Sequence, residues 1–281
     1  MNITVSRSVP TIQAHRFFST AGMSGRLKSI VEKQFPIHPF QGSITQENRL
    51  PLLRNYLAMS QAFPYLQAGS QKELVFAAIQ QNADIPKDVE QTSVVGNFLC
   101  WDETGGHQLI LENGMPALPK ILDTRRHFHS NLLKKDLTLL LKQNIQPDYS
   151  PVTQVYLKTL YNRLSSHNKL VRGSMMVGFE MHAYPMIVAL WQSVSDQFQV
   201  DKEKLDYFKT HVGGENPAEA HHVAMTQSLI RDLVLDKEEE QFIQEFQKSY
   251  ALNINWCRSL VLMKEKTEGI YKTFVWGLGF V

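Results

Sequence analysis

The chain has 281 residues, 43% of them hydrophobic, and its 29 basic side chains nearly balance 27 acidic ones. This content is enough for one sizeable core, and the balanced charge gives no electrostatic reason to expect nucleic acid or an anionic membrane as a partner. No apolar run reaches the roughly 18 residues of a membrane-spanning helix. The only cysteines, Cys100 and Cys257, predict buried thiols in a reducing compartment, so we expect a cytoplasmic protein without disulfides.

The first 31 residues differ in composition from the rest of the chain. They contain Arg7, Arg16, Arg26 and Lys28 but no Asp or Glu. This pattern resembles an organelle transit peptide, and it also fits a partly disordered leader. We therefore expect a leader over residues 1–31 and one folded domain over residues 32–281.

Apolar residues recur every three or four positions along most of that domain, which is the period of an α-helix. Residues 50–66 show it with Leu53, Tyr56, Leu57 and Phe63. The predicted helices, in chain order, span residues 50–66, 71–85, 89–101, 132–142, 152–165, 170–194, 202–212, 216–233 and 236–264. For the helix at 216–233, Asn216 and Pro217 supply a cap and a first-turn proline.

Two-residue alternation is nearly absent, and residues 107–111 are the one short stretch that permits a strand. Residues 114–119 contain Gly and Pro and predict an excursion between helices, because they are too short and too apolar for a domain linker. The sequence therefore predicts an all-α fold in a single domain.

Carboxylates and histidines gather at four places near the predicted helices. Residues 102–107 follow an apolar helix and include Glu103 and His107, four positions apart. A second group, with His127 and His129, lies at residues 125–133. Residues four positions apart on a helix share a face, so Glu103 and His107 could contribute to one site. The second group offers further histidines for such a site.

Glu180 is the third place, and it lies within an apolar stripe. Met176, Val177, Tyr184 and Ile187 share its helical face. A carboxylate in such surroundings is costly unless it is paired or bound to a metal. A salt bridge at the edge of the stripe and a metal ligand both remain open.

The fourth group, residues 211–222, is the densest. Glu219 and His222 are three positions apart and share a helix face, as metal ligands in helical bundles do. Carboxylate and imidazole ligands together indicate iron or manganese more than a zinc ion held by sulfur ligands. Glu219 is also three residues after Asn216, so a capping box is the alternative, and His221 and His222 cannot both face the same way.

The order of these groups resembles that of the heme-oxygenase-like diiron oxidases. The likeness covers residues 38–264: residues 38–44 are similar to an early HPF…G segment of that family, residues 102–105 to its iron-binding glutamate segment, and residues 129–133 to the run opened by its histidine. Glu180 and His211 follow at the family's spacing. The resemblance implies a heme-oxygenase-like helical bundle with a set of carboxylate and histidine iron ligands: Glu103, His129, Glu180, His211, Glu215, Glu219 and His222.

Two departures from the family pattern leave alternatives. An insertion separates Glu103 from His129, so His107 competes with His129 for the first site. Between His211 and His222, Gly213, Gly214 and Pro217 would break a straight helix. Which of Glu215 and Glu219 binds metal is therefore open, and His221 competes with His222.

The resemblance also implies a function. It implies an enzyme that holds two iron ions per chain, takes O2 as co-substrate, and oxidises a small acid, an amino acid or a fatty acid by C–C cleavage or N-oxygenation. An external electron donor and a homodimer are compatible with it. One alternative is an iron-free relative that processes a cofactor, with Cys100 as the candidate nucleophile. Another is a helical protein-interaction module that uses the insertion as its surface.

Overall fold

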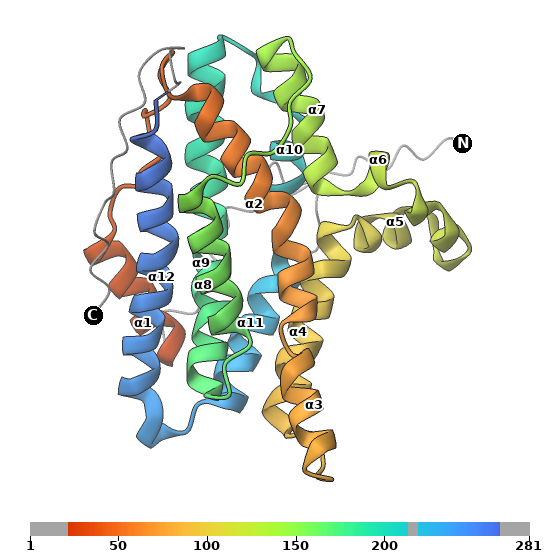
Figure 1. Ribbon diagram of the computed structural model, residues 1–281, viewed down its shortest axis with the longest axis vertical. Helices are drawn as coiled ribbons and strands as arrows, with labels where there is room; N and C mark the ends of the chain where they lie inside the picture. The colour runs from red at the N-terminus through yellow and green to blue at the C-terminus, as the bar shows by residue number, and fades with distance from the viewer. Residues whose placement is uncertain (1–21, 213–218, 265–281) are drawn as a thin grey trace, which may run out of the picture.

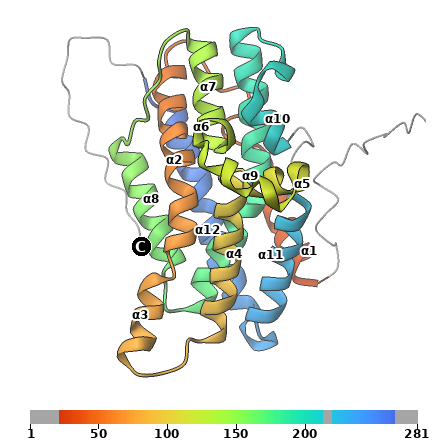
Figure 2. The same cartoon turned by 90° about the vertical axis from the view of Figure 1, so that its right-hand side faces the viewer.

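The computed structural model describes residues 22–212 and 219–264, and helices supply all the regular structure within them. The α-helices are α1 (Gly22–Gln34), α2 (Arg49–Gly69), α3 (Lys72–Gln80), α4 (Lys87–Glu103), α5 (Gly106–Asn113), α6 (Thr124–His127), α7 (His129–Leu141), α8 (Pro151–Leu164), α9 (Lys169–Phe198), α10 (Asp206–Val212), α11 (Glu219–Leu233) and α12 (Glu239–Val261). Three short 3-10 helices are η2 (Met115–Leu122), η3 (Lys202–Lys204) and η4 (Asp236–Glu238). The predicted all-α, single-domain fold is confirmed (Figures 1 and 2).

Helix α9 is the centre of the bundle. It packs against α8, α10, α11 and α12, and its residues 173–179 are buried on every side. A helix that is apolar all round is stable only when neighbours cover each face. At Gly178 the neighbour comes especially close, since a Cβ there would lie 3.0 Å from the Cβ of Ser249 on α12. Glu180 follows this buried stretch of α9, and only 9% of its side chain is exposed.

Contacts with α2, α10 and α11 hold α4 and α7 near α9. Helix α2 packs against α4, α7 and α8, while α4 also contacts α9 and α11, and α7 contacts α10. The C-terminal end of α4 and the N-terminal end of α7 therefore lie near α9, α10 and α11. None of the helices in the described ranges combines the length and the apolarity that crossing a lipid bilayer requires.

The boundary predicted at residue 31 falls within a helix. Residues 22–31 belong to α1, which contacts α12. Leu27 is fully buried, and Met23, Ile30 and Val31 pack against the same core. The other residues assigned to the leader, 1–21, lie outside the described residues.

The segment between α4 and α7 contains two short α-helices and a 3-10 helix. Residues 107–111, the one stretch that permitted a strand, are part of α5, and most of the excursion at 114–119 is the 3-10 helix η2. Together α5, η2 and α6 form an arm that extends away from the bundle (Figure 1). The helix predicted at 216–233 is observed from Glu219, and its proposed cap, Asn216 with Pro217, lies outside the described residues.

Candidate metal centre

Gly105 lies at the start of the arm and contacts His127 at its end, which brings the ends of α4 and α7 together. Its φ is +79°, a conformation that ends α4 and that residues with a side chain adopt at a cost. A Cβ at this position would lie 2.4 Å from the carbonyl oxygen of His127, so the absence of a side chain also permits the close return of the arm. As a result Glu103, the last residue of α4, lies beside His129, the first residue of α7.

We expect Gly105→Ala to lower the free energy of unfolding by ~1–3 kcal/mol, because strain and the clash with His127 add together. Urea unfolding measures this change. Gly69→Ala is the matched control, since a Cβ at Gly69 meets nothing within 4 Å. Equal stability of the two variants would contradict this account of the arm.

One carboxylate and two imidazoles form what we call the Glu103 cluster: Glu103, His129 and His211. The Oε2 atom of Glu103 is 3.5 Å from Nδ1 of His129 and 4.0 Å from Nε2 of His211. The two imidazole rings stand nearly perpendicular, with centroids 4.7 Å apart. One ligand atom from each residue lies within 4.8 Å of the others, which is close enough for one metal ion to join them.

A second group, the Glu180 cluster, consists of Asp102, Glu180 and His222 and comes from α4, α9 and α11. The Nδ1 atom of His222 is 3.4 Å from Oε2 of Glu180, and its Nε2 is 3.1 Å from Oδ2 of Asp102. All three residues are nearly buried. A metal-bound histidine commonly gives its other ring N–H to a carboxylate, and these distances fit Glu180 as the co-ligand and Asp102 as that partner.

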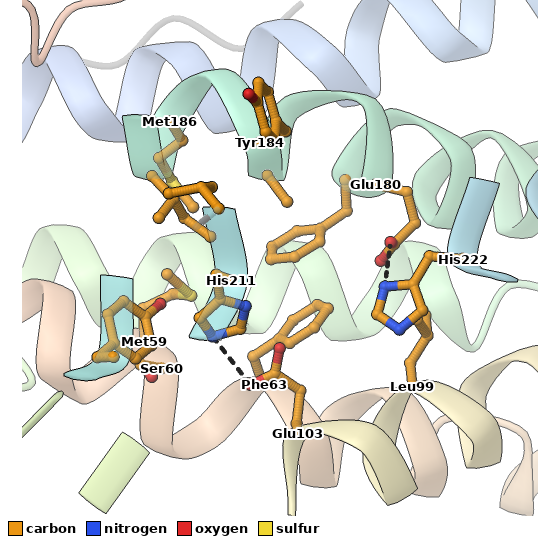
Figure 3. A pocket seen from close by; sticks show the side chains of 15 residues that line it. Met59, Ser60, Phe63, Leu99, Glu103, Glu180, Tyr184, Met186, His211 and His222 are labelled. Atoms are coloured by element: carbon orange, nitrogen blue, oxygen red, sulfur yellow. Dashed lines mark ion pairs between the residues drawn. The ribbon is translucent and has the colours of Figure 1, made fainter. Parts of the chain in front are cut away.

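Both clusters adjoin one small cavity. Its lining includes Glu103, Glu180, His211 and His222, and its volume is about 40 Å³. In Figure 3, His211 and His222 approach from opposite sides, each paired with its own glutamate. The rings of Phe63 and Phe179, stacked with centroids 3.7 Å apart, also line the cavity. The site is therefore narrow and has an apolar wall.

Burial and neighbouring charges shift the pKa values of the three residues in the Glu103 cluster. Burial alone would raise the pKa of Glu103, but His211 and His129 outweigh it and the pKa is lowered. Burial lowers the pKa of His211 to about 4 against the opposing effect of Glu103. For His129, burial also acts to lower the pKa, but the contact with Glu103 raises it overall. An ionised carboxylate therefore faces a neutral imidazole, His211, which has a lone pair for a metal.

In the Glu180 cluster, the two carboxylates outweigh burial and favour the protonated form of His222. Burial acts to lower the pKa of His222, but Asp102 and Glu180 raise it well above its ordinary value. Two buried carboxylates thus create a strong preference for positive charge between them. A metal cation satisfies the same preference.

Three observations indicate that these residues suit a metal ion. The Nε2 atom of His211 is buried and makes no hydrogen bond within the described part of the chain, and such an atom is costly unless something binds it. The donor atoms are carboxylate oxygen and imidazole nitrogen, which suit iron or manganese. The small cavity has room for particles the size of a few waters.

Helix α10, which carries His211, is held in place by a residue that the sequence did not single out. The carboxylate of Asp136 on α7 accepts the backbone N–H groups of Asp206 and Tyr207, at 3.1 and 2.9 Å, at the start of α10. The ring of Tyr207 in turn contacts His211, with centroids 4.5 Å apart. Asp136 therefore fixes the helix that presents His211 to the Glu103 cluster.

Five of the seven predicted ligands lie in the two clusters. Glu215 lies outside the described residues, and of Glu219 the structure gives only the backbone, at the start of α11. The competing residues His107 and His221 lie side by side, with ring centroids 5.5 Å apart, and neither lines the small cavity. The structure thus places His129 with Glu103, and His222 with Glu180.

Asp102 is the member of the clusters that sequence reasoning missed. It is 1% exposed and is three and seven positions after the buried Leu99 and Val95. Like Glu180, Asp102 is a carboxylate within an apolar stripe, and this pattern is visible in the sequence.

We expect Asp102→Asn to lower metal affinity at the Glu180 cluster by roughly 10–100-fold, as loss of a ligand's supporting partner does. The amide oxygen can still accept the ring N–H of His222, but it lacks the negative charge that strengthens this hydrogen bond, so the ring is held less firmly. Calorimetric titration with Mn(II) measures the change. The control is Asp84→Asn, an exposed residue before α4, and equal affinity in both variants would remove Asp102 from the site.

A third group, His38, His182 and Cys257, brings ligand atoms equally close but fits a metal poorly. Nδ1 of His38 accepts the backbone N–H of Phe40 at 3.1 Å, so its proton is on Nε2. That Nε2 lies 3.1 Å from Nε2 of His182 and donates to it. A metal would need the lone pair that this tautomer lacks, so the contact is a structural hydrogen bond between the turn at residues 38–40 and α9.

Comparison with known proteins supports the fold. No family model and no curated protein matches the chain. Among solved structures, the chain is similar to a CADD-like protein of unknown function from Nostoc punctiforme, with 12% identity and a TM-score of 0.61 over 85% of this chain and 95% of that chain. At this identity the likeness concerns the fold alone. Fold and site together define an all-α bundle with two carboxylate–histidine clusters at one internal cavity.

Proposed function

We propose that this chain is a non-heme diiron enzyme that activates O2 to oxidise a small organic molecule. One observation carries the proposal: helices α4, α7, α9, α10 and α11 bring the Glu103 and Glu180 clusters to a single buried cavity. Carboxylate and histidine ligands projecting inward from different helices are the way that helical bundles hold two iron ions. The sequence resemblance to diiron oxidases and the fold shared with a CADD-like protein support it further.

The residues divide into distinct roles under this proposal. Glu103, His129 and His211 would hold one ion, and Glu180 with His222 the other. Asp102 would keep the ring of His222 in one orientation. Bound iron would supply the electrons and the Lewis acidity needed for reaction with O2. Leu99, Phe63 and Phe179 line the same cavity and would keep water from it, which preserves the strength of the electrostatic contacts. The resemblance implies oxidative C–C cleavage or N-oxygenation as the reaction.

The iron-free alternative, with Cys100 as nucleophile, is less well supported. Cys100 is only partly buried, contrary to the prediction of a buried thiol. Burial and the nearby charge of Glu103 nevertheless raise the pKa of Cys100. A reactive cysteine needs a lowered pKa so that the thiolate forms, and the surroundings of Cys100 oppose this.

The test is anaerobic loading with Fe(II), removal of unbound metal and iron analysis, followed by measurement of O2 consumption. The proposal expects about two iron ions per chain, as di-iron bundles hold, and O2 uptake that requires them. A folded chain that retains no iron would instead favour the iron-free enzyme or the interaction module.

A further inference from the structure

The arm formed by α5, η2 and α6 exposes large apolar side chains to solvent. Four of them lie within residues 111–122 and are between 37% and 81% exposed: Leu111, Met115, Leu118 and Leu122. The bundle does not cover these side chains, because the arm extends away from it (Figure 1). Exposed apolar groups concentrated in this way commonly mark a surface that another molecule covers.

Positive charge gathers beside these apolar side chains. Residues 120–135 carry five basic side chains and one carboxylate, Asp123, in a chain whose net charge is only +2. Lys135 is paired with Asp206. Three of the others are exposed and form no ion pair with any residue that the structure describes: Lys120, Arg125 and Arg126. The arm has one further carboxylate, Glu112, so cations outnumber anions, and a protein that complements this surface is acidic.

The base of the arm adjoins the Glu103 cluster. Gly105 and His127 meet there, and each is two residues from a member of the cluster. A hollow of about 530 Å³ lies between the arm and α10, and its lining includes Arg126 of the arm and Thr210 of α10, which directly precedes a histidine of the cluster. A protein bound to the basic part of the arm would therefore lie beside the end of the bundle that contains this cluster.

The exposed apolar area of the arm is small. Four side chains of this kind offer on the order of a few hundred Å², below the roughly 800 Å² per partner of a standard stable complex. A permanent dimer therefore needs more surface than the arm supplies. Transient encounters between redox proteins lie at this low end of the range of interface sizes.

We propose that the arm docks an acidic one-electron carrier of the ferredoxin class, through its exposed apolar side chains together with Lys120, Arg125 and Arg126. The role of this carrier as electron donor rests on the proposed diiron function. Docking itself does not, because none of the side chains named on this surface is a candidate metal ligand. Each reduced carrier gives up one electron and leaves oxidised, so two carriers are used for each pair of iron ions returned from Fe(III) to Fe(II).

The first experiment compares two carriers of opposite charge. Titration calorimetry with the full-length protein measures binding of a plant-type ferredoxin, which is acidic, and of cytochrome c, which is basic. We expect ferredoxin to bind with micromolar affinity that falls as salt is raised, because salt screens exposed charges. Cytochrome c should not bind. Absence of ferredoxin binding, or equal binding of the two carriers, would overturn the proposal.

Charge reversal locates the binding surface. The double variant Arg125→Glu, Arg126→Glu should weaken ferredoxin binding at least about tenfold, because two attractive charges become repulsive. The control is the double variant Lys72→Glu, Lys158→Glu, which changes the net charge equally at exposed positions on α3 and α8. If both double variants lose the same affinity, the effect belongs to net charge and not to the arm.

A second pair of variants tests the apolar part of the surface. Leu122→Ser should weaken ferredoxin binding several-fold, because it removes apolar area that the complex would bury. Leu262→Ser, after the end of α12, is the matched control, since the two leucines are 81% and 80% exposed. Wild-type affinity in Leu122→Ser would remove the apolar side chain from the contact.

Other occupants of the arm give different results. If a second copy of the chain covered it, Leu122→Ser would change the sedimentation of the protein alone. If a membrane surface covered it, the wild type would bind phosphatidylserine vesicles and the Arg125→Glu, Arg126→Glu variant would not. Either result in a protein that does not bind ferredoxin would replace the proposed carrier.

This proposal and the diiron function fail in different ways. Iron retained by a chain that does not bind ferredoxin would remove the docking surface alone. Ferredoxin binding by a folded chain that never retains iron would remove the diiron function, and with it the role of the carrier as electron donor.

Discussion

Glu103→Gln should lower iron affinity at the Glu103 cluster by more than about 100-fold. Loss of a residue that only supports a ligand already costs roughly 10–100-fold, and Glu103 is the only carboxylate that the structure places between His129 and His211 within the described residues. Glutamine keeps the size of the side chain but removes the charge that offsets the cation. Iron retained after gel filtration and calorimetry with Fe(II) under anaerobic conditions measure the effect.

The same substitution changes the neighbouring histidine. Glu103 raises the pKa of His129 against the effect of burial, so the pKa of His129 should fall in the variant, which NMR titration of the metal-free protein detects. Glu112→Gln, on the exposed part of α5, is the matched control. Wild-type iron affinity in Glu103→Gln would show that the cluster does not bind the metal.

The second large effect is expected at Glu180. Glu180→Ala should abolish binding at the Glu180 cluster, because His222 is then left with Asp102 as its only carboxylate neighbour of the cluster. The metal-free variant should stay folded, with its free energy of unfolding within about 1–2 kcal/mol of the wild type, since a buried carboxylate is itself costly. Iron analysis and urea unfolding on the same preparations separate the two quantities.

Glu73→Ala, on the exposed face of α3, controls for the loss of a glutamate in general. An unfolded Glu180→Ala protein would indicate that Glu180 serves stability and not the metal. Unchanged iron content in a folded variant would contradict its role as a ligand.

The helices were predictable because burial repeats along the sequence at the helical period. For α2 and α8 the expected bounds differ from the observed ones by a few residues at most. Helix α1 was missed although Met23, Leu27, Ile30 and Val31 follow the i, i+4, i+7, i+8 pattern of a helix with one buried face. The lack of acidic residues over residues 1–31 favours a leader, whereas this stripe predicts a helix.

The site was predictable in part. The positions of Glu103, Glu180, His211 and His222 followed from charged or polar residues near apolar stripes and from the resemblance. The meeting of Glu103 with His129 could not be derived from spacing, because it depends on a contact in space between Gly105 and His127. The role of Asp136 likewise depends on where α10 begins relative to α7.

The most direct measurement is an anomalous diffraction map, recorded at the iron absorption edge, from crystals of the iron-loaded protein. We expect two peaks inside the bundle, one within bonding distance of Glu103, His129 and His211 and one within bonding distance of Glu180 and His222. A map without peaks between these side chains, from crystals whose iron content is confirmed, would contradict the shared metal centre.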